Sequence, residues 1–439
     1  MEYLPILMLL SLLVFFFTGY PIAFILGGIA VIFGTIGVGF DILSLLPMRI
    51  WGRVNNIILI AVPFFIIMGI ILERTGISEE LLDTLGKLFK NVRGGVPLSL
   101  LAVGTILAAT TGLVGAVVVT VGSIALPGML KQGYSQSYST GSICAVGTLG
   151  QIIPPSIILV LLGDVVGVSV GELFAGALVP GFFLVLLYGL YMYWDTRLHP
   201  PVADLNNPAV VTDKETQQNM WVLCSRTLVP PALLIVGVLG SIFLGIASPT
   251  EAAAVGAFGS LIIAIFKKRI NMKSMKEIAV AATKLNAMVF LILIGATAFG
   301  LVFRMIGGDD LIRNIFFSLD IGKYGILALI MLIIFILGFF LEVVEIIFIF
   351  VPLLAPIVLE LGFNPLWICI MICINLQTAF LTPPMGFAII YLKAVCPTQV
   401  KTTDIYKGVI PYIVLQVVAL IFFMVFPEIA TWLPSLLFK

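Results

Sequence analysis

Long apolar runs separated by short polar segments dominate the pattern of this chain. A helix needs about 20 apolar residues to cross a bilayer. Runs near this length predict membrane helices at 3–19, 21–40, 54–73, 172–194, 221–247, 250–266, 278–304 and 408–437. We expect the first run to be a membrane helix rather than a cleaved signal, because no Lys or Arg precedes it and a second apolar run begins at Pro21.

Four further apolar segments are interrupted in the middle. Residues 96–130 and 324–360 are too long for one crossing, and each is predicted to be a helical hairpin that enters and leaves on one side of the membrane. Residues 137–165 and 365–395 each contain a proline pair. Because proline interrupts the hydrogen bonds of a helix, these two segments are predicted to be broken helices.

The two proline pairs belong to an internal repeat. GTLGQIIPPS contains Pro154-Pro155 and NLQTAFLTPPMG contains Pro383-Pro384, 229 positions further on. The same offset aligns LPGMLKQGY with APIVLELGF, so the offset is shared by two separate blocks. We interpret this as a duplication. Helix breaks at matching places in two halves of an apolar protein indicate a transport site near the membrane midplane.

The expected architecture is an all-α polytopic membrane protein of two repeats, residues 1–194 and 221–439, joined by a cytoplasmic linker at 195–220. Each repeat has five crossings, and because five is odd the two repeats are predicted to be inverted relative to each other. The first repeat comprises scaffold helices within 3–73, an arm at 78–94, a hairpin at 96–130, a broken helix at 137–165 and a last helix at 172–194. The second comprises scaffold helices within 221–304, an arm at 308–322, a hairpin at 324–360, a broken helix at 365–395 and a last helix at 408–437.

Composition and charge support this topology. The chain is 61% hydrophobic and 10% charged, with a mean hydropathy of +1.21, which is more apolar than a soluble domain can bury. The net charge of +1 gives no indication of a nucleic-acid partner. With the linker inside, 17 of the 23 basic residues face the cytoplasm, as the positive-inside rule requires. The six left outside are Arg49, Arg53, Arg304, Arg313, Lys323 and Lys439.

The predicted tips of the hairpins carry the candidate chemistry. The first tip falls at TTGLVGA, where Gly112 and Gly115 let the backbone leave the helix, and the second falls at LEVVE. Each tip is expected to meet the proline break of its own half. Broken helices offer carbonyl groups to a small cation such as sodium, and their N-terminal ends favour an anion. The alternative is that these Pro and Gly residues only kink packed helices.

Glu342 and Glu345 lie in a strongly apolar stretch, where a central charge costs roughly 2.5–3.5 kcal/mol. Their spacing of three puts both on one face if the segment is helical. Either they form a cation or proton site, or the hairpin tip reaches water and the acids face it; the sequence leaves both open. Neutral oxygen ligands that suit sodium flank the two breaks at Thr148, Gln151, Ser156, Asn375, Gln377, Thr378 and Thr382.

Other motifs indicate structure more than chemistry. Ser248-Pro249-Thr250-Glu251 is typical of a helix start. Asp309-Asp310 with Arg313 suggests a diphosphate-binding pair, and so a membrane prenyltransferase as a remote alternative, but no second such motif is present. A single histidine, His199, excludes the His-Glu-x-x-His zinc site of intramembrane proteases.

With these residues in view, the chain resembles the large membrane subunit of TRAP (tripartite ATP-independent periplasmic) transporters over nearly its whole length. The segments that carry the resemblance are RGGVPLSL, LPGMLKQGY, GTLGQIIPPS, ELFAGALVPG, GIASPTEAAAVGA and TPPMG. The resemblance implies a sodium-driven elevator importer of small organic anions in the bacterial inner membrane. It also implies a small four-helix membrane subunit and a periplasmic substrate-binding protein as partners.

By this analogy the two hairpins and two broken helices move against the scaffold. Residues expected to contact the substrate, a carboxylate such as a 2-oxo or hydroxy acid or a sulfonate, are Thr111, Gly112, Gln151, Pro155, Ser156, Gln377 and Pro384. Residues expected to hold co-transported sodium are Gly112, Gly115, Gly147, Pro154, Glu342, Glu345, Asn375, Thr378 and Thr382. The chain departs from many members of the family, which have Gly-Ser-Ser at the first tip and Asp at the position of Glu342. A self-sufficient sodium/anion symporter without a binding protein is the alternative.

Overall fold

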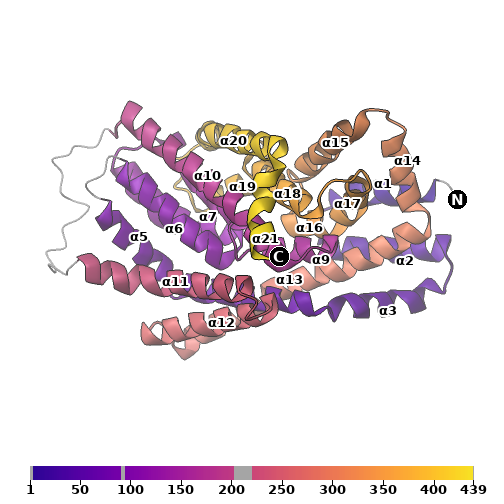
Figure 1. Ribbon diagram of the computed structural model, residues 1–439, viewed down its shortest axis with the longest axis horizontal. Helices are drawn as coiled ribbons and strands as arrows, with labels where there is room; N and C mark the ends of the chain where they lie inside the picture. Colours follow the sequence, from indigo (N-terminus) through magenta and orange to yellow (C-terminus); the bar gives the residue numbers. More distant parts are fainter. Residues whose placement is uncertain (1–2, 90–93, 202–219, 439) are drawn as a thin grey trace.

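The computed structural model describes residues 3–89, 94–201 and 220–438, and every regular element in these ranges is a helix (Figure 1). The helices of the first half are α1 Leu4–Phe16, α2 Ile22–Gly37, α3 Ile42–Val54, η1 Ile57–Ile60, α4 Ala61–Arg74, α5 Ile77–Leu88, α6 Gly95–Thr111, α7 Val114–Lys131, α8 Gln136–Thr148, η2 Leu149–Gln151, α9 Ile157–Val166 and α10 Val170–Leu198. Those of the second half are α11 Met220–Phe243, α12 Pro249–Phe266, α13 Met272–Met305, α14 Gly308–Phe317, α15 Gly322–Leu337, α16 Val343–Ile349, α17 Val351–Glu360, α18 Pro365–Leu381, α19 Phe387–Val395, α20 Thr402–Val425 and α21 Pro427–Leu437. The predicted all-α class is therefore confirmed.

Seven of the described helices are long and apolar enough to cross a membrane, and an eighth span results if the bent pair α16 and α17 counts as one. The predicted crossings α1 and α2 are shorter, at 13 and 16 residues. By contrast α7, which we predicted to be half of a hairpin, is among the seven. The chain is thus a multi-pass membrane protein. Residues 202–219, most of the predicted linker, lie outside the described part, as do residues 90–93 at the end of the first predicted arm.

The predicted offset of 229 reappears in the boundaries of the helices. Helices α7 and α17 end at Lys131 and Glu360, and α9 and α19 end at Val166 and Val395, each pair 229 residues apart. Helices α16 and α17 meet at a bend of 58°, whereas α7, the matching element of the first half, is one continuous helix. The short helices α5 and α14, which occupy the predicted arms, lie toward opposite ends of the molecule (Figure 1). The two predicted arms therefore do not lie side by side.

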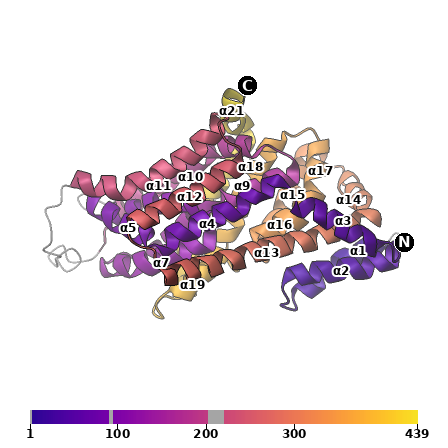
Figure 2. The same cartoon turned by 90° about the horizontal axis from the view of Figure 1, so that it is seen from below.

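One side of the molecule is a layer formed by α2, α3, α4, α11, α12 and α13, which lies nearest the viewer in Figure 2. The hairpins and broken helices pack on this layer: α4 contacts α6 and α9, and α13 contacts α16. Helices α8 and α20 cross where Gly141 meets Gly408. A Cβ on Gly141 would lie 2.0 Å from the Gly408 carbonyl oxygen, so only glycine permits this approach.

Helix α3 is the main element that the sequence pattern did not predict. It contains Pro47 and two arginines, which interrupt the apolar run. In the structure α3, η1 and α4 follow one another along the 34-residue α13, and both α3 and α4 pack against it. The interruption comes at Asn56, whose side chain accepts a hydrogen bond from Ile58 N and starts η1.

The last predicted helix, 408–437, is also different in the structure. It divides into α20 and α21 at Phe426, which has φ −120° and ψ 68° and precedes Pro427. A residue before proline is pushed out of the helical region by the proline ring, so the chain turns here. Helix α21 then packs across α10 and α18 instead of continuing α20.

Candidate functional site

The first hairpin tip meets the proline break of its own half. Helix α6 ends at Gly112, which adopts a left-handed φ of 61°. A Cβ on Gly112 would lie 3.1 Å from Ile157 N, the first amide of α9 after Pro154-Pro155. The backbone of this tip therefore lies against the N-terminal end of a helix, as the sequence predicted. Such an end carries free amide groups and the positive pole of the helix dipole.

The layer helix α4 covers the same tip. A Cβ on Gly69 would lie 2.7 Å from Thr111 Cα and 3.1 Å from the Thr110 carbonyl oxygen, so α4 approaches the backbone of the tip directly. The hydroxyls of both threonines are buried and donate to the Leu107 carbonyl oxygen at 2.9 Å. Their side chains thus close the end of α6, while the carbonyl groups of its last turn have no partner within the helix.

The second tip is organised by the two glutamates. Glu342 is the N-cap of α16 and forms a reciprocal capping box with Glu345. The Glu342 backbone N–H donates to Glu345 Oε2 at 2.9 Å. Glu345 therefore has a structural task, which is to reach back and satisfy an amide at the start of its own helix. Both side chains are only partly buried.

Tyr391 of α19 lies between the two tips. Its hydroxyl donates to Glu342 Oε1 at 2.7 Å, and its ring faces the first tip, where a Cβ on Gly115 would lie 3.2 Å from the ring. Tyr391 was not among the residues predicted from sequence. The available signal is a tyrosine within the apolar segment FAIIYLKAV, since a phenolic hydroxyl in such a segment needs a partner.

The two halves meet at a buried polar cluster. Gln377 Nε2 and Gln416 Nε2 both donate to Thr148 Oγ1 at 3.3 Å, and Gln416 Nε2 also donates to the Tyr188 hydroxyl at 2.7 Å. All four side chains are fully buried. Thr148 and Gln377 are 229 residues apart, so they occupy equivalent positions in the two halves. Helices α8 and α18 therefore meet at equivalent residues, with Gln416 and Tyr188 beside them.

The first proline break is completely buried. Ser156 Oγ donates to the Gln151 carbonyl oxygen at 2.9 Å, and Cys373 Sγ of α18 lies 3.0 Å from the same oxygen. The side-chain amide of Gln151 is fully buried, yet neither its Nε2 nor its Oε1 has a hydrogen-bond partner among the described residues. A buried polar atom without a partner costs about 1–3 kcal/mol, so this amide is suited to receive a ligand or an ion.

The second break differs from the first. Pro384 is exposed, whereas Pro155 is buried. Asn375 Nδ2 donates to the Met331 carbonyl oxygen at 2.7 Å. Thr378 and Thr382 donate to carbonyl oxygens one turn back in the chain, which leaves the lone pairs of both hydroxyls available.

The two breaks lie on opposite sides of the point where the halves meet. Thr148 contacts Gln377, and Gln151, further along the chain, contacts the earlier residue Cys373. The chain thus runs in opposite directions through the two halves at this point. Cys373 and Gln377 are four residues apart on α18, so Gln151 packs against the face of α18 that carries Gln377. No hydrogen bond among the described residues links Pro155 to Pro384.

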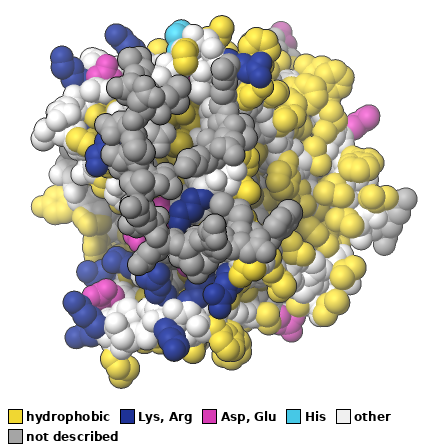
Figure 3. Space-filling model, turned by 90° about the vertical axis from the view of Figure 1, so that its left-hand side faces the viewer, with side chains coloured by type: hydrophobic (Ala, Val, Ile, Leu, Met, Phe, Trp, Pro, Cys, Tyr) yellow, Lys and Arg dark blue, Asp and Glu magenta, His cyan; other side chains and the backbone are white. Residues whose placement is uncertain are grey.

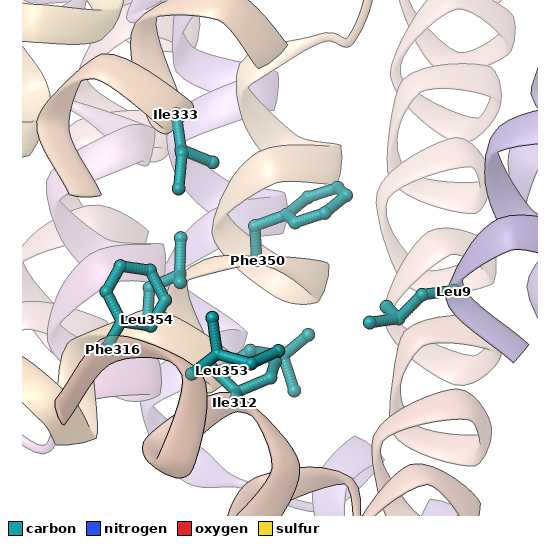
Figure 4. A pocket seen from close by; sticks show the side chains of 8 residues that line it. Leu9, Ile312, Phe316, Ile333, Phe350, Leu353 and Leu354 are labelled. Atoms are coloured by element: carbon teal, nitrogen blue, oxygen red, sulfur yellow. The ribbon is translucent and has the colours of Figure 1, made fainter. Parts of the chain in front are cut away.

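Two cavities border the second hairpin, and neither is lined by a residue predicted for the substrate or ion. The first, of about 160 Å³, is wholly apolar and lies between α1, α14 and the hairpin. Figure 4 shows the residues that line it, among them Leu9, Ile312, Phe316, Ile333, Phe350, Leu353 and Leu354. It offers no group that could bind an anion. The second cavity, of about 180 Å³, lies between α3, α13 and α14 on one side and α9, α16 and α17 on the other.

The secondary motifs are structural. Ser248 and Glu251 form the predicted capping box at the start of α12. Asp309 and Asp310 lie in the first turn of α14, where acidic residues are stabilised by the helix dipole. Asp164 was not among the residues predicted from sequence; it lies in the apolar helix α9 and pairs with Arg53 at 3.2 Å. A lone charge in an apolar run was the signal for this pair.

Comparisons with known proteins agree along the whole chain. A profile of the family described as tripartite ATP-independent periplasmic transporter, DctM component, matches residues 9–429. The C4-dicarboxylate TRAP transporter large permease protein DctM of Pseudomonas aeruginosa is 30% identical, with 90% of each chain covered. The isethionate TRAP transporter permease protein DctMQ of Oleidesulfovibrio alaskensis is 30% identical over 96% of this chain, which spans 64% of that relative.

A solved structure shares the fold. The YdaH transporter of Alcanivorax borkumensis superposes with a TM-score of 0.67 over 98% of this chain and 99% of that one, at 12% sequence identity. The related permeases are transport proteins rather than enzymes, so the prenyltransferase alternative is excluded. This chain belongs to the DctM component family of tripartite ATP-independent periplasmic transporters, and it is a large permease of that family.

Proposed function

We propose that this chain is the large permease of a sodium-coupled importer that receives a small organic anion from a periplasmic binding protein. Two relatives carry C4-dicarboxylate and isethionate in their names, which supports a carboxylate or sulfonate as the substrate. A 2-oxo or hydroxy acid falls in the same class. Amide groups and hydroxyls recognise oxyanions of either kind, because each offers hydrogen-bond donors to the charged oxygens.

The unpaired amide of Gln151 is the observation that carries the substrate proposal. It lies at the buried break beside Gly112, and the adjoining N-terminal end of α9 adds the positive pole of a helix. An oxyanion at this place would accept a hydrogen bond from Gln151 Nε2, and Ser156 would join it only by releasing the Gln151 carbonyl oxygen. The proposed set in full is Thr111, Gly112, Gln151, Pro155, Ser156, Gln377 and Pro384.

The proposed sodium ligands are oxygen atoms at the two tips and breaks. Carbonyl groups at Gly112, Gly115, Gly147 and Pro154 would serve the first half. Carboxylate, amide and hydroxyl oxygens of Glu342, Asn375, Thr378 and Thr382 would serve the second, with Glu345 fixing the tip. Hard oxygen ligands suit an alkali cation. The link from Tyr391 to both tips supports a single event in which sodium orders both tips together.

The proposed moving part comprises the hairpins α6–α7 and α15–α17 with the broken helices α8–α9 and α18–α19. These helices pack on one another across the two halves, since α7 contacts α19 and α9 contacts α16. The second hairpin contacts the layer through α13, and the cavity of about 180 Å³ beside this contact leaves space between the hairpin and the layer helices α3 and α13, which supports relative movement there. Inverted halves and an elevator movement remain part of this proposal.

The proposed orientation puts the basic end of the molecule in the cytoplasm of a bacterial inner membrane. Figure 3 shows Lys and Arg side chains gathered on the end where α10 and α12 finish. Positive charge is retained on the cytoplasmic side of membrane proteins. The proposed partners are a small four-helix membrane subunit and a periplasmic binding protein. The relative named DctMQ, of which this chain spans 64%, supports the small subunit.

Uptake into proteoliposomes tests this function. The chain and its small subunit would be reconstituted and offered labelled succinate and isethionate, with and without an inward sodium gradient and the binding protein. Uptake that needs both supports the proposal. Uptake with sodium alone favours the self-sufficient symporter, and uptake that ignores sodium refutes the coupling.

A further inference from the structure

The second cavity gathers three arginines at the junction between the layer helices and the second hairpin. Arg49 and Arg53 project from α3 and Arg304 projects from α13, and all three line the cavity of about 180 Å³. Asp309 at the start of α14 is the one carboxylate in the same lining. The remaining walls are largely apolar, and they come from α9, α13, α16 and α17.

The charges in this cavity are not balanced. Arg53 pairs with Asp164 of α9 at 3.2 Å, and Asn56 also donates to Asp164. Arg304 uses Nε to bind the Gly300 carbonyl oxygen at 3.1 Å, which leaves its terminal nitrogens available. Among the described residues no carboxylate oxygen lies within 4.0 Å of the Arg49 or Arg304 guanidinium. The cavity therefore retains excess positive charge even after Asp164 and Asp309 are counted.

Arg49 and Arg304 are exposed, so their excess positive charge is open to an anion from solution. Arg49 and Arg53 are four residues apart and so lie on one helix face, where like charges repel. Arg304 adds a third positive charge to the same cavity, and a cavity lined mainly by charges of one sign attracts ions of the opposite sign. Burial raises the pKa of the Asp309 carboxyl, and the nearby Arg304 opposes this shift. The planar guanidinium group matches the two oxygens of a carboxylate, sulfonate or phosphate.

The cavity is connected to the candidate substrate site by α9. Val165 near the end of this ten-residue helix lines the cavity, and Ile157 at its start contacts the first tip. Ten residues of helix span about 15 Å. An anion in the cavity would thus be held about one short helix away from Gln151. The three arginines fall on the face that the proposed orientation places outside, where the binding protein delivers substrate.

We infer that the cavity formed by Arg49, Arg53 and Arg304 is a receiving site that binds the oxyanion group of the incoming organic anion before it reaches the proline break. This inference rests on the proposed function for the identity of its occupant. The anionic headgroup of a lipid presents the same oxyanion chemistry, and the test below separates the two sources.

The test measures anion binding and transport on the complex with its small subunit in nanodiscs and proteoliposomes of neutral phosphatidylcholine. The probes are succinate, isethionate and inorganic sulfate. We expect Arg49→Gln and Arg304→Gln each to weaken probe binding at least about tenfold, because each removes a charge-assisted hydrogen bond. Uptake should show a raised KM and an unchanged kcat. Arg49→Lys should restore part of the affinity, because the charge remains without the planar fork.

Lys323→Gln is the matched control, because it removes one positive charge from the same face outside the cavity. Unchanged probe affinity and KM in both arginine variants would overturn the inference, as would the absence of saturable binding to the unaltered complex at millimolar probe. An effect of Arg49→Gln only after phosphatidylglycerol is added would assign the cavity to a lipid headgroup and overturn the role of a free anion. Arginine-dependent binding without sodium-dependent uptake would keep this site and refute the proposed function.

Discussion

Tyr391 makes two contacts that no other described side chain makes together: its hydroxyl binds Glu342 and its ring covers Gly115. The first contact is charge-assisted, and such hydrogen bonds contribute about 1.5–3 kcal/mol. At the residue scale this tyrosine is the direct connection between the second tip and the first. Communication between the tips would then depend on one hydroxyl and one ring face.

We predict that Tyr391→Phe keeps the ring contact and loses the hydrogen bond. The half-saturating sodium concentration for uptake should rise about tenfold, following the loss of a charge-assisted hydrogen bond. Thermal unfolding should change little, since the ring still packs. The exposed Tyr324→Phe is the control and should match the unaltered protein. Equal sodium dependence in Tyr391→Phe would remove Tyr391 from the ion site.

The sequence allows two interpretations of Glu342 and Glu345. In the structure the two glutamates have different hydrogen-bond partners. Glu345 accepts from the Glu342 backbone, whereas Glu342 accepts from Tyr391. A capping group needs an acceptor oxygen but no charge. We therefore predict that Glu345→Gln retains sodium-driven uptake, because the amide oxygen still caps α16.

Glu342→Gln, the matched variant, should lower sodium affinity about tenfold, because a neutral amide replaces a charged ligand. Uptake measured over a sodium titration compares the two. Equal loss in both variants would return Glu345 to the ion or proton site.

At the scale of elements, the first tip is held by the close approach of α7 to α19. The space at Gly115 is already filled by the Tyr391 ring, and a single Cβ would be a tight contact at 3.2 Å. Bulkier groups in a packed site typically cost about 1–3 kcal/mol and force neighbours to move. A bulkier side chain at position 115 would therefore push the first tip and Tyr391 apart.

We predict that Gly115→Val abolishes sodium-driven uptake in protein that still inserts and folds. Gly128→Val in the same helix is the control, because nothing lies within 4 Å of a Cβ at Gly128. Uptake assays should be paired with size-exclusion profiles, so that loss of folding is recognised. Normal uptake by Gly115→Val would contradict the assignment of the first tip.

The helix ends at the first tip and at the two aligned proline pairs could be predicted because their signals are local. Gly112 and the two aligned proline pairs lie next to the ends of α6, η2 and α18, whereas Pro230-Pro231 lies inside α11 without ending it. Helix α3 was missed because Arg49, Arg53 and Pro47 resemble a polar loop in a hydropathy pattern. Packing against α13 and α2 stabilises this segment as a helix, and these contacts are not visible in a hydropathy pattern. The contacts of Tyr391 and Gln416 could not be predicted from local sequence, because their partners lie 49 and 268 residues away.

At the scale of the whole molecule, the proposed orientation follows from the distribution of positive charge. Lys273 at the start of α13 and Lys323 at the start of α15 fall on opposite sides of the proposed membrane. We predict that cysteines introduced at 273 and 323 react with a membrane-impermeant maleimide from opposite sides. The background would carry Cys224→Ser and Cys396→Ser, since these two native thiols are partly exposed.

Labelling in intact and in permeabilised cells shows on which side of the membrane each position lies. Position 323 should react in intact cells, and position 273 only after permeabilisation. The reverse pattern would invert the orientation and place the arginine cavity inside. Labelling of both positions from one side would contradict the proposed crossing of the intervening helix.

The most direct test of the account is sodium flux that depends on the anion. Proteoliposomes with the complex would receive labelled sodium together with the binding protein, either loaded with substrate or empty. We predict that sodium enters only with the loaded binding protein, in a fixed ratio to the anion taken up. Anion entry without any accompanying sodium would contradict it.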